Sequence, residues 1–227
     1  CYSDIVVMRH PEPFVPHKSS DSLTVPLINA GDGANQHPTQ TLADIFTIYM
    51  YKKRLSNLKI GFCGDLKYGR TVHSLIKTMD RYHNNSFVCI SPDNLKFPQE
   101  ILKDIKSPVI EEHELEACMS DLDVLYMTRV QRERFPNIEE YEKHKGCYIL
   151  TKEKMELAKT DTIVMHPLPR VDEIHKSVDD DPRAVYFQQA KAGMYIRMAL
   201  ILSLLGLSIQ QLNSDQEEQK VVAICSV

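Results

Sequence analysis

Six short apolar runs in this chain are continuous rather than alternating, and stretches of helical composition separate them. The runs cover residues 4–8, 25–29, 58–64, 86–91, 123–128 and 162–167. A strand with one face in water alternates apolar and polar side chains, whereas a strand that is covered on both faces has no such alternation. The pattern therefore predicts an α/β fold, with a parallel sheet flanked by helices.

Stretches of helical composition predict where the helices lie and how the chain divides into domains. Helices are expected at residues 39–54, 70–82, 96–105, 152–159 and 189–206. The last is the most apolar, and Gly206 is typical of a C-terminal stop. The first and last helices enclose the α/β run and could each bridge two domains. We expect a first part at 1–45, a main domain at 46–190, a returning helix at 191–207 and a tail at 208–227.

Charge and hydropathy argue against two classes of partner. The 227 residues carry 27 basic and 31 acidic side chains, for a net charge of −4, which gives no broad cationic field for a nucleic acid. No apolar run approaches the roughly 20 residues that cross a bilayer, and the N-terminus has no signal-peptide pattern. We therefore expect a cytoplasmic protein without a nucleic-acid or membrane partner.

The six cysteines predict neither a metal site nor a redox motif. They form no C-x-x-C pair and no Cys/His pair at zinc-ligand spacing, so no metal and no cofactor is predicted. Cys63, Cys89 and Cys147 stand in apolar runs, where a cysteine behaves as a small buried hydrophobe.

Two polar loops open predicted helices. In GDLKYGRTVHSL, Arg70 begins a helix whose dipole it opposes; it is either a solvated cation or the partner of an anionic ligand. The loop is neither a Walker A motif nor G-x-G-x-x-G. In GDGANQHPTQTL, His37 and Gln40 flank a helix start. They are either capping residues or groups that polarise a carbonyl and hold a planar NH2 group.

Two more loops follow predicted strands. In TRVQRERF, Arg129 and Gln131 project to one side if the backbone stays extended, and an arginine fork suits a carboxylate. The simpler interpretation of Glu133 is that it forms ion pairs in a solvated loop. In HPLPRVDE, Pro167 and Pro169 fix the directions of the backbone carbonyl groups. Either these carbonyls accept hydrogen bonds from a ligand, or the prolines only form a rigid structural turn.

The four loops together predict one anion pocket at the carboxyl ends of the parallel strands. No nucleophile with its base and no paired carboxylates can be assigned in them. The residues suit a reaction in which the substrates supply nucleophile and leaving group, while the protein supplies orientation and electrostatics.

In order and spacing, the four strings resemble the aspartate/ornithine carbamoyltransferase family, and the aspartate enzymes above all, over residues 4–207. The resemblance implies a Rossmann-like aspartate-binding domain and the last part of a similar carbamoyl phosphate-binding domain. It implies attack by the amino group of L-aspartate on carbamoyl phosphate, an early step of pyrimidine synthesis. The ornithine enzymes of the family have a sequence similar to H-C-L-P-R at the position where this chain has HPLPR. They also lack the R-x-Q pair. The resemblance therefore favours aspartate over ornithine as the substrate.

The resemblance also assigns roles to single residues. His37 and Arg9 would meet carbamoyl phosphate, and Gln40 with the carbonyls of Pro167 and Leu168 would hold its NH2 group. The two carboxylates of aspartate would be bound by Arg70, Arg129 and Gln131. The residues expected to support these side chains are Glu133, Lys67, His166 and Arg197.

The chain also departs from the family. The Ser-Thr-Arg-Thr-Arg phosphate motif and a mobile lysine loop do not occur in it, the first residue is not methionine, and we expect the N-terminal part of a longer protein to be missing. Three prolines follow Arg9, where the family opens a helix rich in small residues. The resemblance further implies a homotrimer with shared active sites, and a regulatory chain as a further candidate partner. The alternative function is a non-catalytic dicarboxylate-binding or regulatory module.

Overall fold

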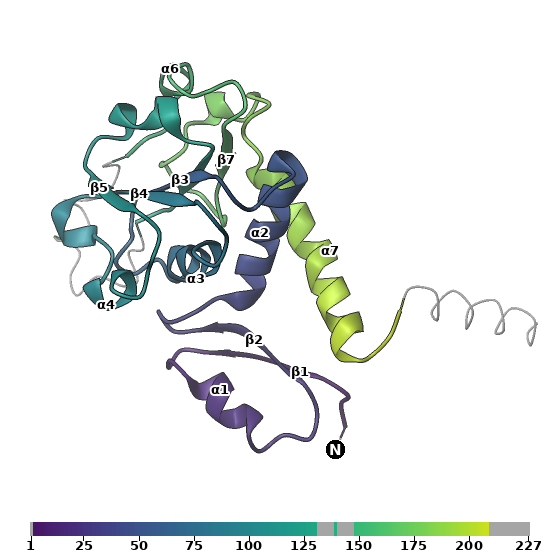
Figure 1. Cartoon of the computed structure of the whole chain (residues 1–227). Coiled ribbons are helices and arrows are strands. Elements are labelled where there is room, and N and C mark those ends of the chain that lie inside the picture. The colour runs from purple at the N-terminus through teal and green to yellow at the C-terminus, as the bar shows by residue number, and fades with distance from the viewer. Residues whose placement is uncertain (1, 131–138, 140–147, 209–227) are drawn as a thin grey trace, which may run out of the picture.

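The computed structural model describes residues 2–130, 139 and 148–208 and contains two parallel sheets (Figure 1). The larger sheet has the strand order β5-β4-β3-β6-β7, with every neighbouring pair parallel. Its strands are β3 (Lys59–Cys63), β4 (Ser86–Ile90), β5 (Val109–Glu112), β6 (Val124–Met127) and β7 (Ile163–Met165). The smaller sheet pairs β1 (Val6–His10) with β2 (Leu27–Asp32). The predicted α/β fold with parallel sheets is confirmed.

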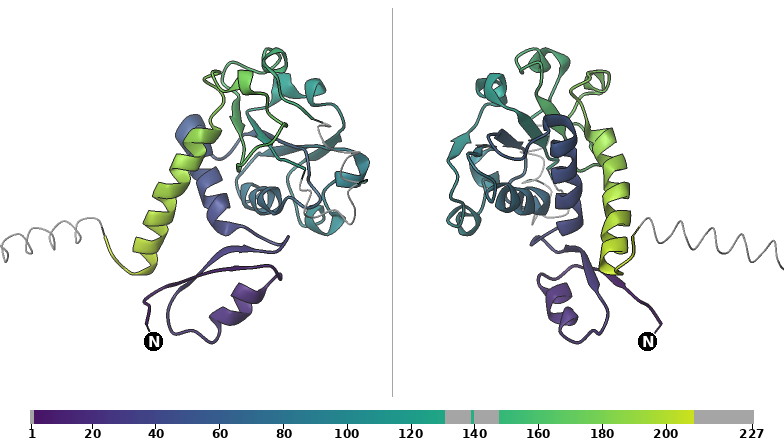
Figure 2. Two further views of the ribbon diagram at one scale, coloured as in Figure 1. Left: turned by 180° about the vertical axis from the view of Figure 1, so that it is seen from behind. Right: turned by 45° about the vertical axis from the view of Figure 1, so that its right-hand side comes forward.

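One long helix connects the two sheets, and a second long helix lies beside it. In Figures 1 and 2, α2 (Pro38–Lys52) leaves the smaller sheet and reaches the larger one, and α7 (Tyr186–Leu204) returns beside it. The other helices among the described residues are α1 (Val15–Ser20), α3 (Arg70–Met79), α4 (Gln99–Leu102) and α6 (Lys152–Met155). The single turns of 3-10 helix are η1 (Asp93–Leu95), η2 (Leu115–Ala117), η3 (Met119–Asp121) and η5 (Lys176–Val178).

Apolar side chains cover both faces of the larger sheet, which explains its continuous apolar strands. Ile60 and Phe62 of β3 point to one face and pack with Tyr126 of β6 and with residues of α2 and α3. Cys63 and Leu125 belong to a second buried cluster, on the other face. Each strand therefore has to be apolar at consecutive positions.

One strand of the larger sheet has no counterpart in the sequence prediction. Strand β5 lies at the edge of the sheet, its Ile110 is exposed, and it ends on Glu111 and Glu112. An edge strand needs only part of its surface to be apolar, and charged side chains there oppose pairing with other chains. The expected continuous apolar run is therefore missing from β5.

The ends of several elements differ from the predicted ones. Strands β1 and β2 begin two residues later than expected and continue into polar residues. Helix α4 has four residues where ten were expected, and α7 begins three residues early. A short α1 forms within the proline-containing segment, because Pro16 lies in its first turn, where a missing N–H costs nothing.

The end of α7 has the geometry predicted for its glycine. Gly206 has φ +69°; its N–H donates to the carbonyl of Ser203, and the N–H of Leu207 donates to the carbonyl of Leu202. This pair of bonds is a Schellman motif, which satisfies carbonyls that the helix end leaves open.

Cys63, Cys89 and Cys118 are buried thiols outside any disulfide, as predicted for the first two, while Cys147 lies outside the described residues. The described part of the chain contains no helix whose length and apolarity would let it cross a membrane. In the same part, no group of three or more His, Cys, Asp or Glu side chains is placed to hold a metal ion.

Candidate active site

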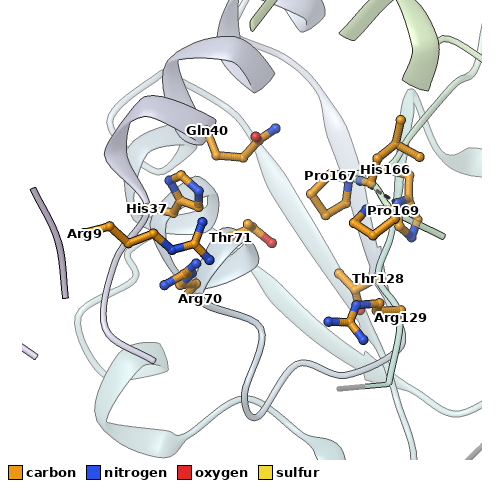
Figure 3. A pocket seen from close by; sticks show the side chains of 11 residues that line it. Arg9, His37, Gln40, Arg70, Thr71, Thr128, Arg129, His166, Pro167 and Pro169 are labelled. Carbon is orange, nitrogen blue, oxygen red and sulfur yellow. Dashed lines mark hydrogen bonds between the residues drawn. The ribbon is translucent and has the colours of Figure 1, made fainter. Parts of the chain in front are cut away.

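A cavity of about 280 Å³ lies between the smaller sheet and the carboxyl ends of β6 and β7. Figure 3 shows two walls: Arg9, His37, Gln40, Arg70 and Thr71 on one side, and the residues from β6 and β7 on the other. The full lining consists of Arg9, His37, Gln40, Arg70, Thr71, Thr128, Arg129, His166, Pro167, Leu168 and Pro169. Three arginines and no carboxylate occur among these lining residues, so the cavity suits an anion.

The fold brings most of the predicted site residues into this cavity. Eight of them line it: Arg9, His37, Gln40, Arg70, Arg129, His166, Pro167 and Leu168. Arg197 contacts the site through Gln40. Lys67 is exposed, with its ammonium 5.2 Å from the centroid of the Tyr68 ring, and is not a lining residue. Gln131 and Glu133 lie outside the described residues.

Arg70 reaches across to the turn after β2. Its guanidinium donates to the carbonyl of Gly33 at 3.0 Å, and a Cβ on Gly31 would lie 2.9 Å from its Nη1 atom. Gly31 also has φ +116°, a conformation that favours glycine. Arg70 is therefore partly buried at the junction of the two sheets, and not the solvated cation of the alternative interpretation.

His37 precedes α2 and is held by α3, because its backbone N–H donates to the Ser74 hydroxyl at 3.1 Å. Burial lowers the pKa of His37, and the positive charges of Arg70, Arg197 and Arg9 act in the same direction, so that the pKa falls to about 4. The imidazole is therefore neutral near pH 7. A neutral imidazole keeps one N–H, which can donate to a carbonyl oxygen without adding charge.

The low pKa of His37 gives a prediction for the chain without ligand. Its ring-proton signal in an NMR titration should change at about pH 4 rather than at the ordinary value of 6.5. As the pH falls from 6.5 towards 4, the unfolded chain takes up a proton that the folded chain does not, so the folded state loses stability in that window. A bound phosphate should raise the pKa by offsetting the arginine charges. His37→Asn identifies the signal, and a midpoint of 6.5 in the free chain would contradict the prediction.

The Gln40 amide is fixed by a buried carboxylate. Its Nε2 atom donates to Oδ1 of Asp44 at 2.8 Å, and its oxygen accepts from Arg197 at 3.4 Å. Asp44 is fully buried and also accepts from Gln189 at 2.6 Å and from the Tyr126 hydroxyl at 2.9 Å. Burial raises the pKa of Asp44 to about 6, although these hydrogen bonds oppose the rise.

The loop after β7 is held by a buried hydrogen bond between a histidine and a carboxylate. Nδ1 of His166 accepts from the N–H of Leu168 at 2.8 Å, so its proton is on Nε2, which donates to Glu173 at 2.6 Å. The other oxygen of Glu173 accepts from the N–H groups of Val171 and Asp172, each at 3.1 Å. The loop is therefore rigid, with a cis bond between Leu168 and Pro169.

Arg129 is the second residue after β6 and is positioned by its neighbour in the chain. The hydroxyl of Thr128 accepts from the N–H of Asp65 at 2.9 Å and donates to the carbonyl of Cys63 at 3.1 Å. A Cβ on Gly64 would lie 2.4 Å from the carbonyl oxygen of Thr128. Glycine thus lets the ends of β3 and β6 approach closely, which places Arg129 at the cavity.

The sequence matches two family models. Residues 56–204 match the aspartate/ornithine carbamoyltransferase Asp/Orn binding domain, and residues 1–50 match the carbamoyl-P binding domain of the same family.

Individual relatives agree with these models. The chain is 57% identical over 210 residues to the aspartate carbamoyltransferase catalytic subunit of Clostridium kluyveri, covering 91% of this chain and 69% of that protein. The catalytic subunit of M. jannaschii aspartate transcarbamoylase superposes with a TM-score of 0.83 at 47% identity, over 90% of this chain and 67% of that one. The Trypanosoma cruzi aspartate transcarbamoylase in complex with N-(phosphonacetyl)-L-aspartic acid superposes with a TM-score of 0.84 at 40% identity. The match covers 91% of this chain and 67% of that one.

Proposed function

Because this chain belongs to the aspartate/ornithine carbamoyltransferase family, we propose that it is an aspartate carbamoyltransferase. The reaction transfers the carbamoyl group of carbamoyl phosphate to the amino group of L-aspartate, giving N-carbamoyl-L-aspartate and phosphate for pyrimidine biosynthesis. The observation that carries the proposal is the cavity, which gathers three arginines, a neutral histidine, an oriented amide and a rigid loop.

The chemistry requires no nucleophile from the protein. The deprotonated amino nitrogen of aspartate attacks the carbonyl carbon of carbamoyl phosphate, and the carbonyl oxygen gains negative charge. When the tetrahedral intermediate collapses, the C–O bond to phosphate breaks and the phosphate leaves with the electron pair. The attacking nitrogen gives up one proton to the leaving phosphate, which departs as hydrogen phosphate.

On this proposal, the residues of the cavity act by position and charge. His37 donates its one N–H to the carbonyl oxygen, where charge develops, and Arg9 contacts the same oxygen and the phosphate. Donors fixed in advance at a developing charge stabilise the transition state without having to reorganise. The NH2 group of the carbamoyl moiety donates to the Gln40 oxygen and to the carbonyls of Pro167 and Leu168.

The proposed aspartate subsite consists of Arg70, Arg129 and Gln131, which would bind the two carboxylates. Two arginine forks match two carboxylates in geometry and charge. The same arginines disfavour ornithine, because its side chain ends in a cationic ammonium group. On the family pattern Glu133 would orient Arg129, and Lys67 would support the loop before Arg70.

We also propose the domain bounds given above, a homotrimer with active sites shared between neighbouring chains, a cytoplasmic location and a regulatory chain as a further partner. Their support is the family resemblance alone. Sedimentation of the purified chain reports the oligomeric state directly.

The test is product formation by the purified chain with carbamoyl phosphate and either L-aspartate or L-ornithine. We expect carbamoyl-aspartate and no carbamoyl-ornithine. Turnover with ornithine would contradict the proposed substrate. If neither product forms while N-(phosphonacetyl)-L-aspartate still binds, the chain is instead a dicarboxylate-binding module.

A further inference from the structure

Among the described residues, Asp44 is a fully buried carboxylate that does not line the cavity, yet it contacts two groups that lead into the cavity. We propose that Asp44 is a positioning residue that orients both acceptors of the carbamoyl NH2 group: the Gln40 oxygen directly, and the loop of Pro167 and Leu168 through Gln189. The inference rests on the proposed function, because that function assigns the NH2 group to these acceptors.

The first step is the orientation of the Gln40 amide. An ionised carboxylate only accepts hydrogen bonds, so the side of the amide that faces Asp44 has to be its NH2 group, at 2.8 Å. The amide oxygen then faces the other way, where Arg197 donates to it at 3.4 Å. A carbonyl oxygen has two lone pairs, and the second one can accept from a substrate NH2 group.

The reverse orientation would work against the substrate. If the Gln40 amide turned over, its oxygen would face a carboxylate oxygen of Asp44, and its NH2 group would face the NH2 group of the substrate. Both contacts are repulsive. Asp44 therefore selects the one amide orientation that recognises a carbamoyl group.

The second step runs through Gln189 on α7. Its NH2 group donates to the same Oδ1 atom of Asp44 at 2.6 Å, which turns its oxygen towards β7, where it accepts from the backbone N–H of His166 at 2.9 Å. His166 is the residue before Pro167 and Leu168. One oxygen of Asp44 thus fixes the orientation of both glutamine amides, and the Gln189 amide holds the first residue of the loop.

The third contact of Asp44 leads into the core. The Tyr126 hydroxyl donates to Oδ2 at 2.9 Å, and the Tyr126 ring packs against Phe62 at 6.2 Å between centroids. This contact fixes the carboxylate, and Tyr126 is not itself a lining residue, although its hydroxyl also bonds to Thr71 and Gln189. Tyr126→Phe therefore offers a control that removes one hydrogen bond from Asp44 and leaves the bonds from both glutamines to Asp44 in place.

The experiment compares two ligands that differ only at the NH2 group. Acetyl phosphate has a methyl group where carbamoyl phosphate has NH2, so the ratio of their dissociation constants measures recognition of that group. Both constants are measured by calorimetry on the full chain and its variants, without turnover. We expect the unmodified chain to bind carbamoyl phosphate about tenfold or more tightly than acetyl phosphate; equal affinities would overturn the inference.

Asp44→Leu removes the acceptor, and the preference for carbamoyl phosphate should fall by about tenfold. Asp44→Asn should keep it, because the Asn oxygen can accept from both glutamines while its NH2 group donates to the Tyr126 hydroxyl. Tyr126→Phe should also keep it. A merely structural role would weaken both ligands alike and leave their ratio unchanged.

A second variant keeps the test decisive if Asp44→Leu does not fold. Gln189→Met leaves the Gln40 contact intact but releases the N–H of His166, and should lower the preference by a smaller factor. The inference is overturned if the folded variants Asp44→Leu or Gln189→Met keep the full preference, or if Asp44→Asn loses it. Loss of product formation with the ligand ratio intact would count against the proposed function and not against the role of Asp44.

Discussion

Arg129→Ala should weaken the binding of a dicarboxylate by about 2–3 kcal/mol, or about 30- to 150-fold in the dissociation constant. Arg129 lines the cavity at the end of β6, where its guanidinium can form a charge-assisted pair with one carboxylate of aspartate. Alanine removes the charge and both donors of the fork. Calorimetric titration with succinate, in the presence of phosphate, measures the effect without turnover.

Arg54→Ala is the matched control for this prediction. Arg54 follows α2 and has a largely exposed side chain that interacts with Asp123 at 3.7 Å and with the carbonyl of Asn57. It is not among the residues that line the cavity, so the same loss of charge there should leave succinate binding within about twofold. Equal affinities of Arg129→Ala and the unmodified chain would remove Arg129 from the aspartate subsite.

Glu173→Ala should lower the free energy of unfolding by about 2–3 kcal/mol, because it removes a buried charged acceptor and leaves its donors without a partner. The variant leaves the Nε2 proton of His166 without its acceptor and frees the N–H groups of Val171 and Asp172. Denaturant unfolding measures the change. Because Leu168 depends on the same histidine, the affinity for carbamoyl phosphate should fall as well.

The pH dependence of this pair has a definite sign. Burial raises the pKa of Glu173, but the hydrogen bond from His166 and those from backbone N–H groups lower it more, so the pKa lies below its ordinary value of 4.5. The stabilisation is therefore present above pH 4.5 and is lost as the pH falls through the lowered value. The exposed Glu100 on α4 offers a control, since Glu100→Ala should change stability by less than about 0.5 kcal/mol. A similar small change for Glu173→Ala would show that the pair contributes little.

The fold was predictable wherever burial on both faces forces consecutive apolar residues. Strands β3, β4, β6 and β7 meet that condition and were found close to their predicted positions. Strand β5 does not, because an edge strand tolerates two glutamates. The ends of β1 and β2 were displaced for a related reason: their last residues include Arg9, His10, Gly31 and Asp32, which carry no apolar signal.

The lining of the cavity was largely predictable, because its arginines, histidine and glutamine stand in loops at predicted strand ends and helix starts. The groups that hold them in place were not. Asp44 lies in the middle of a helix. Its burial is indicated only by its position four residues after Gln40, on the helix face that also carries Thr41 and Ile48. Gln189 joins it across 145 residues of sequence, and no local pattern reports such a contact. Gln131 and Glu133 stay predictions.

Arg9 of the smaller sheet lines the cavity together with residues that follow strands of the larger sheet, and this has a consequence for cooperativity. Arg9 reaches the cavity from an exposed position on β1. A ligand that bridges Arg9 and Arg129 acts as a non-covalent cross-link between the two sheets. Its binding free energy stabilises the arrangement in which the two sheets face each other, so ligand concentration favours that arrangement.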